Sequence, residues 1–198
     1  MVNVSAGAMN RRDAVARLLA ARGDALVVTG LGSPSYDVHA CGDSAANYYL
    51  WGAMGGAALV GLGLAQARAG QRVMVITGDG EQLMAMGSLA TIRVARPTNL
   101  DIIVLDNQHY GETGMQGSHT GAGIDLAAVA AACGFAETGC FTTLDEVDAL
   151  AQRLRQAANG PRLFALKVHA ENLPRSLPPR DAVFIKNRLR AHLGLATC

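Results

Sequence analysis

The sequence predicts an α/β fold in which a doubly wound parallel sheet carries helices on both faces. Short apolar runs alternate along the chain with segments that have helical periodicity, and each strand-like run ends at a glycine or a polar turn. Of the 198 residues, 50% are hydrophobic and only 5% are aromatic, a composition that suits an α/β domain rich in alanine and glycine. Ligands of such folds gather at the carboxyl ends of the strands.

The first elements follow from their caps and turns. Residues 10–22 read as a helix that stops at Gly23, and residues 25–29 read as a strand. The loop of residues 30–34, rich in turn-forming residues, then lies at the carboxyl end of that strand. Residues 47–51 are expected to form a second strand, with a turn at Gly52 and a buried helix over residues 54–68.

The central part of the chain contains two apolar runs that suit buried parallel strands. Residues 72–77 form the first run, and the turn Gly78-Asp79-Gly80 follows it directly. Residues 82–93 then read as one helix, which places Leu83, Met86, Leu89 and Ala90 on one face. Residues 100–105 form the second run, which ends at Asp106-Asn107.

The C-terminal part continues the alternation. Asp125 is expected to cap a helix that runs to Cys133, and the capping-box pattern from Thr143 to Glu146 begins a helix that ends near Gly160. Residues 162–169 are expected to form the last strand. Residues 177–190 combine a rigid turn with an amphipathic helix, which either packs on a partner or is exposed.

Length and composition predict one domain over residues 1–198, with a core of about residues 24–170 and a C-terminal arm of residues 171–198. A net charge of +1 without a basic cluster excludes an electrostatic case for nucleic acid or an anionic membrane. Residues 48–65 are mostly apolar, but the turn at Gly52 argues against a membrane span. The four cysteines lack paired metal-ligand spacing and no leader is recognisable, so we expect a cytoplasmic protein with reduced thiols.

Polar residues at two strand ends predict a site for a metal-bridged diphosphate. Asp79 places a hard carboxylate oxygen at the end of one strand, and Asn107 supplies an amide oxygen from the next strand end. Gly78 and Gly80 permit a tight turn and the close approach of a ligand. The helix expected to follow points its N-terminus at the same spot, and Mg²⁺ commonly combines a few protein oxygens with phosphate oxygens.

The motif Gly78-Asp79-Gly80 followed by Asn107 resembles the fingerprint of thiamine diphosphate (ThDP) enzymes. The resemblance implies that Asp79, Asn107 and the main-chain carbonyl of His109 hold Mg²⁺. It also implies that Met54 props the cofactor into its bent conformation and that the carbonyl of Gly52 accepts a hydrogen bond from the cofactor's exocyclic amine.

Further cofactor contacts follow from the same resemblance. The segments involved are the Gly-Asp-Gly turn, the loop after the first strand and the chain that follows the second metal ligand. The residues are Gly30, Gly32, Ser33, Gly78, Gly80, Glu81, Gln82, Tyr110 and Gly111. Glu81 is a departure, because a carboxylate beside an anion is unfavourable unless it points away or reaches another partner.

Residues 49–56, 78–91 and 105–116 narrow the resemblance to the diphosphate-binding half of sulfopyruvate and phosphonopyruvate decarboxylases, over roughly residues 28–135. The implied reaction removes CO₂ from a small 2-oxo acid, with the cofactor carrying the difficult chemistry. Enzymes of this kind need a pyrimidine-binding domain, which supplies the catalytic glutamate. We therefore expect no catalytic residue in this chain, a partner α subunit of similar size that supplies the glutamate, and an α₂β₂ or higher assembly.

Other functions remain open at this stage. The chain is alternatively the ThDP subunit of an acetolactate synthase-like carboligase, of a 2-oxo acid oxidoreductase, or a non-catalytic partner with the same fold, although no cysteine motif for an iron–sulfur cluster is present. A nicotinamide-binding domain fits poorly, because Gly30 and Gly32 lack the third glycine of the fingerprint and Pro34 is expected to interrupt the helix start. The loop of residues 111–120 either closes over substrate or is a solvated connector, and the side chains of His109 and His119 have no assigned role.

Overall fold

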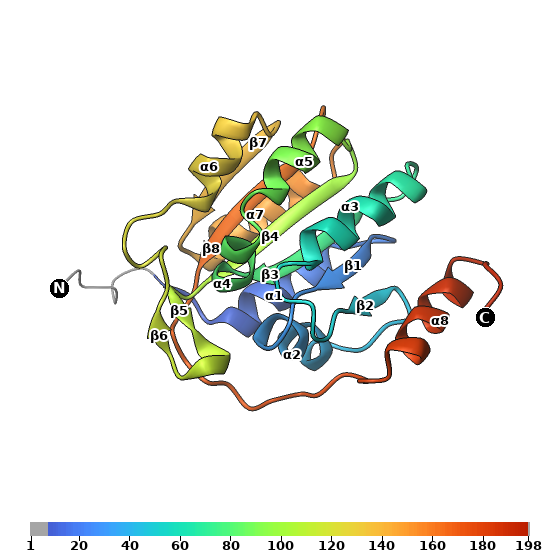
Figure 1. The fold of residues 1–198 in the computed structure, drawn as a ribbon, viewed down its shortest axis with the longest axis horizontal. Coiled ribbons are helices and arrows are strands. Elements are labelled where there is room, and N and C mark those ends of the chain that lie inside the picture. The colour runs from blue at the N-terminus through green and yellow to red at the C-terminus, as the bar shows by residue number, and fades with distance from the viewer. Residues whose placement is uncertain (1–7, 198) are drawn as a thin grey trace.

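The computed structural model describes residues 8–197, which form a six-stranded sheet with helices on both sides (Figure 1). The sheet order is β2-β1-β3-β4-β8-β7, and every neighbouring pair of strands is parallel. The strands are β1 (Leu26–Thr29), β2 (Asn47–Tyr49), β3 (Val73–Gly78), β4 (Leu100–Asp106), β7 (Glu137–Phe141) and β8 (Arg162–Lys167). The predicted doubly wound parallel sheet is therefore confirmed, with β2 on one side of β1, β3 and β4 on the other, and β8 inserted between β4 and the edge strand β7.

Two apolar layers hold the helices against the sheet. Side chains of α3 (Ala57–Ala67), α5 (Ser88–Ala95) and α6 (Leu126–Cys133) pack with Val73 and Val75 of β3 on one face. Side chains of α1 (Arg11–Ala20), α2 (Ser33–Ala40) and α7 (Leu144–Leu154) pack with Met74 and Ile76 on the other face. Successive residues of β3 point to opposite faces, so one buried strand supplies both layers.

The C-terminal helix α8 (Ala182–His192) packs on the edge of the sheet beside β2, at the end of the long arm drawn in red in Figure 1. Asp181 caps its first turn by accepting hydrogen bonds from the backbone of Val183 and Phe184. Ile185 and Leu189 are buried, one in each of the two apolar layers. The helix thus packs one face on the body of this chain, while Val183 and Phe184 on it are exposed. Packing of the exposed face on a partner stays a prediction.

Three predicted helix starts are confirmed. The side chains of Asn10, Asp125 and Thr143 cap α1, α6 and α7, and Glu146 completes the capping box with Thr143. The expected end of α7 near Gly160 was wrong, because the helix ends at Leu154. Apolar periodicity ends there, and turns and irregular chain lead into β8.

The expectation that Pro34 interrupts a helix was also wrong. Pro34 lies in the first turn of α2, where its fixed φ is compatible with the helix and its missing N–H would have no partner in the helix. Gly32 precedes this turn with a φ of +78°, a conformation that favours glycine. The predicted loop is therefore correct only from Gly30 to Gly32.

The helix expected over residues 82–93 is two helices, α4 (Asp79–Met84) and α5. The chain breaks its helical path between Ala85 and Gly87, so Met86 is exposed while Leu89 is buried. The helix expected from residue 54 begins only at Ala57, because Gly55, with a φ of +89°, lies in a turn before it. Strand β2 ends at Tyr49, two residues before the expected end.

Helix α2, strand β7 and the hairpin after β4 were not predicted. Strand β7 lies at the edge of the sheet and has little apolar content. The segment after β4 forms a small antiparallel hairpin, in which β5 (His109–Tyr110), a 3₁₀ turn (Gly111–Thr113) and β6 (Gln116–Gly117) follow one another. Across residues 8–197 no helix has both the length and the apolarity to cross a membrane, and the apolar run 48–65 is divided between β2, a turn and α3.

Candidate functional site

The carboxyl ends of β3 and β4 form one wall of a cavity of about 170 Å³. Gly78 pairs with Leu105 in the parallel register, so Asp79 and Asp106 follow at neighbouring strand ends. The predicted site residues that line this cavity are Ser33, Met54, Gly78, Asp79, Gly80, Glu81, Asn107, His109, Tyr110 and Gly111. Gly30, Gly32, Gly52 and Gln82 lie in the same segments but are not among its lining residues.

The Asp79 carboxylate is buried and oriented by two hydroxyl groups. Its Oδ2 accepts hydrogen bonds from Ser118 Oγ and, over 3.0 Å, from Thr120 Oγ1. No side chain among residues 8–197 donates a hydrogen bond to Oδ1. Burial raises the pKa of Asp79, the two hydroxyls oppose that shift, and the charge of Asp106 reinforces it.

Asp106 extends this network to the next strand. Thr120 Oγ1 lies 2.7 Å from Asp106 Oδ1, so one hydroxyl group stands between the two carboxylates. Lys167 at the end of β8 pairs with Asp106 Oδ2. Burial alone would lower the pKa of Lys167, but the hydrogen bond and charge of Asp106 outweigh it and raise that pKa. The ion pair partly offsets the negative charge gathered at these strand ends.

Asn107 and His109 share a tight turn. Asn107 Oδ1 accepts a hydrogen bond of 2.9 Å from the backbone N–H of His109, and His109 Nδ1 lies 2.8 Å from the Asn107 carbonyl oxygen. Gln108 between them has a φ of +62°, in the left-handed region. The turn therefore holds the Asn107 amide and the main chain of His109 next to each other at the cavity.

The two glycines of the Gly-Asp-Gly turn serve different purposes. A Cβ at Gly78 would meet no atom within 4 Å, so the main chain there is open to a ligand. A Cβ at Gly80 would lie 2.7 Å from Cδ1 of Tyr110, so the tyrosine ring occupies the space of a side chain. The Tyr110 hydroxyl lies 3.0 Å from His119 Nδ1, which links β5 to the segment that follows β6.

Glu81 is buried, and its carboxylate faces protein donors. Oε2 accepts hydrogen bonds from Thr77 Oγ1 at 2.9 Å and from the backbone N–H of Leu31 at 3.1 Å, while Oε1 accepts one from Gly55 N–H at 3.3 Å. Burial raises the pKa of Glu81, and the Thr77 hydroxyl and nearby backbone N–H groups oppose that shift. The Glu81 carboxylate thus reaches other partners, which the sequence analysis requires of a carboxylate beside an expected anion.

The segment from Gly52 to Gly55 forms the turn before α3. Gly52 has a φ of +72°, which favours glycine, and Met54 is 40% exposed although it lines the cavity. An exposed methionine at a cavity wall is available to pack against a bound molecule or a partner.

Sequence reasoning missed several residues of this region. Arg11 and Glu112 line the cavity, and Ser118 and Thr120 hold Asp79. Arg11 has the buried Asp37 as its ion-pair partner. No local pattern marks these residues, because each reaches the site through the fold.

Comparison with known proteins decides the family. Residues 32–168 match the family described as "Thiamine pyrophosphate enzyme, C-terminal TPP binding domain". The chain belongs to this family. The resemblance to ThDP enzymes (thiamine pyrophosphate and thiamine diphosphate are the same compound) is therefore confirmed.

Curated relatives are decarboxylases. Phosphonopyruvate decarboxylase of Streptomyces viridochromogenes is 43% identical over 171 residues, which are 85% of this chain and 42% of the relative. The sulfopyruvate decarboxylase β subunit of Methanococcus maripaludis is 36% identical over 76% of this chain and 80% of the relative. The corresponding subunit of Methanocaldococcus jannaschii is 39% identical over 62% of this chain and 64% of its own length. The chain thus spans less than half of the first relative and most of the β subunits.

Solved structures share the fold at low identity. Benzoylformate decarboxylase from Polynucleobacter necessarius aligns with a TM-score of 0.69 and 18% identity, over 83% of this chain and 34% of that chain. The 4-hydroxybenzoylformate decarboxylase of Rhodococcus jostii RHA1 gives the same TM-score and identity, with 33% of that chain covered. These likenesses support the fold of a TPP-binding domain.

The cavity fits the diphosphate end of the family's cofactor. Hard oxygen donors from Asp79, Asn107 and the His109 main chain suit Mg²⁺, and the open main chain at Gly78 gives a phosphate group room. In the part of the chain that the structure describes, no group of three or more His, Cys, Asp or Glu side chains is arranged to hold a metal ion. A metal here would therefore depend on main-chain, amide and ligand oxygens, which a diphosphate supplies.

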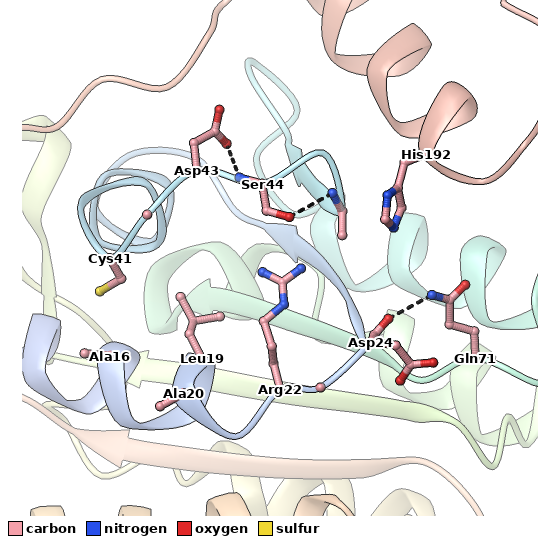
Figure 2. A pocket seen from close by; sticks show the side chains of 13 residues that line it. Ala16, Leu19, Ala20, Arg22, Asp24, Cys41, Asp43, Ser44, Gln71 and His192 are labelled. Atoms are coloured by element: carbon pink, nitrogen blue, oxygen red, sulfur yellow. Dashed lines mark hydrogen bonds between the residues drawn. The ribbon is translucent and has the colours of Figure 1, made fainter.

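A larger hollow of about 630 Å³ lies at the opposite ends of the strands (Figure 2). Except for His192 of α8, its lining residues precede β1, β2 and β3, so it opens at the amino ends of the strands. Gln71 donates to the carbonyl of Asp24, and Arg22 donates to Asn47, so these polar lining groups already have partners. The tendency of ligands in such sheets to bind at the carboxyl ends of the strands favours the smaller cavity as the candidate site.

Proposed function

We propose that this chain is the diphosphate- and Mg²⁺-binding part of a ThDP-dependent 2-oxo acid decarboxylase of the sulfopyruvate or phosphonopyruvate type. The observation that carries the proposal is the arrangement of Asp79 and Asn107 at adjacent strand ends, on a cavity where the main chain of Gly78 is open. Family membership and the names of the curated relatives support it.

The chain's own groups divide into metal ligands and cofactor contacts. Asp79, Asn107 and the carbonyl of His109 bind Mg²⁺, and the diphosphate completes its coordination. Diphosphate and thiazolium contacts come from Gly30, Gly32, Ser33, Gly78, Gly80, Gln82, Tyr110 and Gly111. Met54 would support the bent cofactor, and the Gly52 carbonyl would accept a hydrogen bond from its exocyclic amine. When bound, the cofactor supplies the electron acceptor needed for loss of CO₂.

The catalytic glutamate belongs to a pyrimidine-binding domain on a second polypeptide, in an α₂β₂ or larger assembly. This part of the proposal is supported by the β-subunit relatives, of which the chain covers up to 80%. Two side chains near the cavity also favour a covering partner, since Met54 and Met84 are 40% and 64% exposed. The substrate is a small 2-oxo acid.

A reconstitution assay tests the proposal. The purified chain is assayed for CO₂ release from sulfopyruvate, phosphonopyruvate and pyruvate, alone and with a co-expressed pyrimidine-domain chain, in the presence of ThDP and Mg²⁺. We expect little turnover from the chain alone and at least about a hundredfold more from the complex, because the glutamate is essential to activate the cofactor. Full activity of the isolated chain would contradict the two-chain site, and carboligation products without net CO₂ release would contradict decarboxylation.

A further inference from the structure

Glu81 receives hydrogen bonds from three separate segments at one point beside the candidate site. Thr77 belongs to β3, Leu31 to the loop after β1, and Gly55 to the turn before α3. The carboxylate is 4% exposed and lines the same cavity as Asp79. We propose that Glu81 is a positioning residue, which fixes the loop 30–32 and the turn 52–55 relative to the strand end that carries Asp79.

The donors fit a carboxylate better than any other side chain of this size. One oxygen accepts from Leu31 N–H and Thr77 Oγ1, and the other accepts from Gly55 N–H. A glutamine offers only one acceptor oxygen, so its NH₂ group would face a backbone N–H at one of the two loops. Glu81 is therefore needed as an acceptor on both sides at once.

Charge pairing does not account for the buried carboxylate. Among the ion pairs of residues 8–197, none includes Glu81. Its burial is instead compensated by hydrogen bonds from backbone N–H groups and one hydroxyl, and these donors would lose their acceptor if the side chain were removed. The neighbouring loops thus depend on this one group.

Gly30 lies in close contact with the Glu81 carboxylate. A Cβ at Gly30 would lie 1.7 Å from Glu81 Oε2 and 2.7 Å from Glu81 Cδ, so the carboxylate occupies the space of a side chain. The φ of Gly30 is not in the left-handed region, so the backbone itself does not require glycine there. Glycine at position 30 is therefore explained by close approach to Glu81.

The inference rests on the proposed function for its consequence at the cofactor site. Both tethered segments carry proposed cofactor contacts, with Gly30 to Ser33 on one and Gly52 and Met54 on the other. A fixed arrangement of these segments before binding reduces the ordering that a ligand must impose. A carboxylate that merely happened to lie here would instead repel the diphosphate, so the two possibilities predict opposite signs when the charge is removed.

The first experiment needs no cofactor. Hydrogen exchange of backbone amides, followed by NMR on the unliganded chain, should show protected N–H groups at Leu31 and Gly55. In Glu81→Gln at least one of the two should lose protection, since one acceptor is lost. Asp145→Asn serves as the control, because it also removes one negative charge, from an exposed position on α7 outside the cavity, and leaves both amides bonded. Unprotected amides in the wild type, or equal protection in Glu81→Gln, would overturn the proposal.

A coupling experiment covers the case in which Glu81→Gln does not fold. Gly30→Ala should destabilise the wild-type chain strongly but cost less in a Glu81→Ala background, where the Glu81 atoms at 1.7 and 2.7 Å are gone and only Thr77 Oγ1, at 2.9 Å, remains close to the new Cβ. The expected result is a smaller shift of the urea midpoint in that background. Equal shifts in both backgrounds would show that Glu81 and Gly30 are not coupled and would contradict the proposal.

Cofactor affinity then tests the consequence. In the reconstituted complex, Glu81→Gln should weaken Mg²⁺-dependent ThDP binding by about tenfold or more, in proportion to a lost charged hydrogen bond. Asp145→Asn should not weaken it. Equal or tighter binding by Glu81→Gln would overturn the positioning role. Failure of the proposed function would be recognised separately, as unchanged ThDP binding by Asp79→Ala while the two amides remain protected.

Discussion

Asp79 is held in place before any metal binds. Ser118 and Thr120 both bond its Oδ2, so the side chain is oriented with its other oxygen available. Partners that orient a metal-binding carboxylate tune affinity almost as strongly as the ligands themselves. We therefore expect the chain that follows β4 to contribute to metal binding at the proposed site.

Removing the Thr120 hydroxyl should loosen this arrangement. We expect Thr120→Val to raise the Mg²⁺ concentration required for ThDP binding by about tenfold to a hundredfold, because the hydroxyl links Asp79 with Asp106. The measurement is the Mg²⁺ concentration required for half-maximal ThDP binding in the complex. Thr91→Val, an isosteric change at an exposed site on α5, is the control and should leave that concentration unchanged. Identical behaviour of the two variants would remove Thr120 from the account.

At this scale the sequence marks the proposed metal ligands but not the residues that hold them in place. Asp79 and Asn107 follow strands directly, and a short motif therefore marks them. Ser118 is 39 residues from Asp79, and the contact exists only because the hairpin folds back over the strand end. The direction of the Glu81 side chain was likewise beyond local reasoning, because its partners Leu31 and Gly55 lie 50 and 26 residues away.

At the scale of elements, the capping box of α7 gives a pH-dependent contribution. The backbone N–H of Thr142, that of Thr143 and the Thr143 hydroxyl lower the pKa of Glu146. A carboxyl whose pKa is lower in the folded state stabilises the fold above its unfolded pKa, about 4.3, and this stabilisation is lost as the pH falls through the folded value. Glu146→Gln should therefore be less stable than the wild type at pH 6 and equally stable at the acid end. Urea midpoints at several pH values measure the difference, and a difference that does not change with pH would contradict it.

Helix α8 should stabilise the chain that carries it. Ile185 is 1% exposed, and Ile185→Ala is expected to lower the free energy of unfolding by about 2–5 kcal/mol through lost burial and a cavity. Val183→Ala on the same helix is the control, because Val183 is 59% exposed and should cost less than about 0.5 kcal/mol. Urea denaturation of the two variants measures both values. Equal small effects would mean that α8 does not pack on this body in solution.

Element types were predicted well where periodicity and caps agree, as at Asn10, Asp125 and Thr143. The failures have physical causes. Helical periodicity over residues 82–93 reveals neither the break at Ala85 to Gly87 nor the start of α4 at Asp79. Strand β7 was not predicted, because an edge strand with polar residues has no apolar run to mark it.

At the scale of the whole molecule, the parallel sheet brings the proposed cofactor contacts to the carboxyl ends of its strands. The order β2-β1-β3-β4-β8-β7 places the ends of β1, β3 and β4 side by side, so segments far apart in sequence share one cavity (Figure 1). This much follows from the alternation of strands and helices in the sequence. The paths of α1 and α8, which add buried residues outside residues 24–170, could not be read from local pattern, because their packing depends on which faces the sheet leaves open.

The exposed methionines beside the cavity should belong to the partner interface. A Cβ at Gly55 would lie 3.6 Å from the Met84 Cβ, so Met84 stands beside the turn that carries Met54. We expect Met84→Asp to weaken association with the pyrimidine-domain chain by about tenfold or more, because it places a charge in an apolar contact. Val183→Asp on α8 is the matched control and should bind normally. Analytical ultracentrifugation of the mixed chains measures association, and equal behaviour of both variants would place the interface elsewhere.

The central claim is that Asp79 and Asn107 hold a Mg²⁺-bound diphosphate. Isothermal titration of ThDP into the reconstituted complex, with and without Mg²⁺, tests it most directly when the wild type is compared with Asp79→Ala. We predict that ThDP binding requires Mg²⁺ in the wild type and that the affinity for ThDP is at least about a hundredfold lower in the variant, because the buried carboxylate ligand is gone. Unchanged, Mg²⁺-dependent ThDP binding by Asp79→Ala would contradict it.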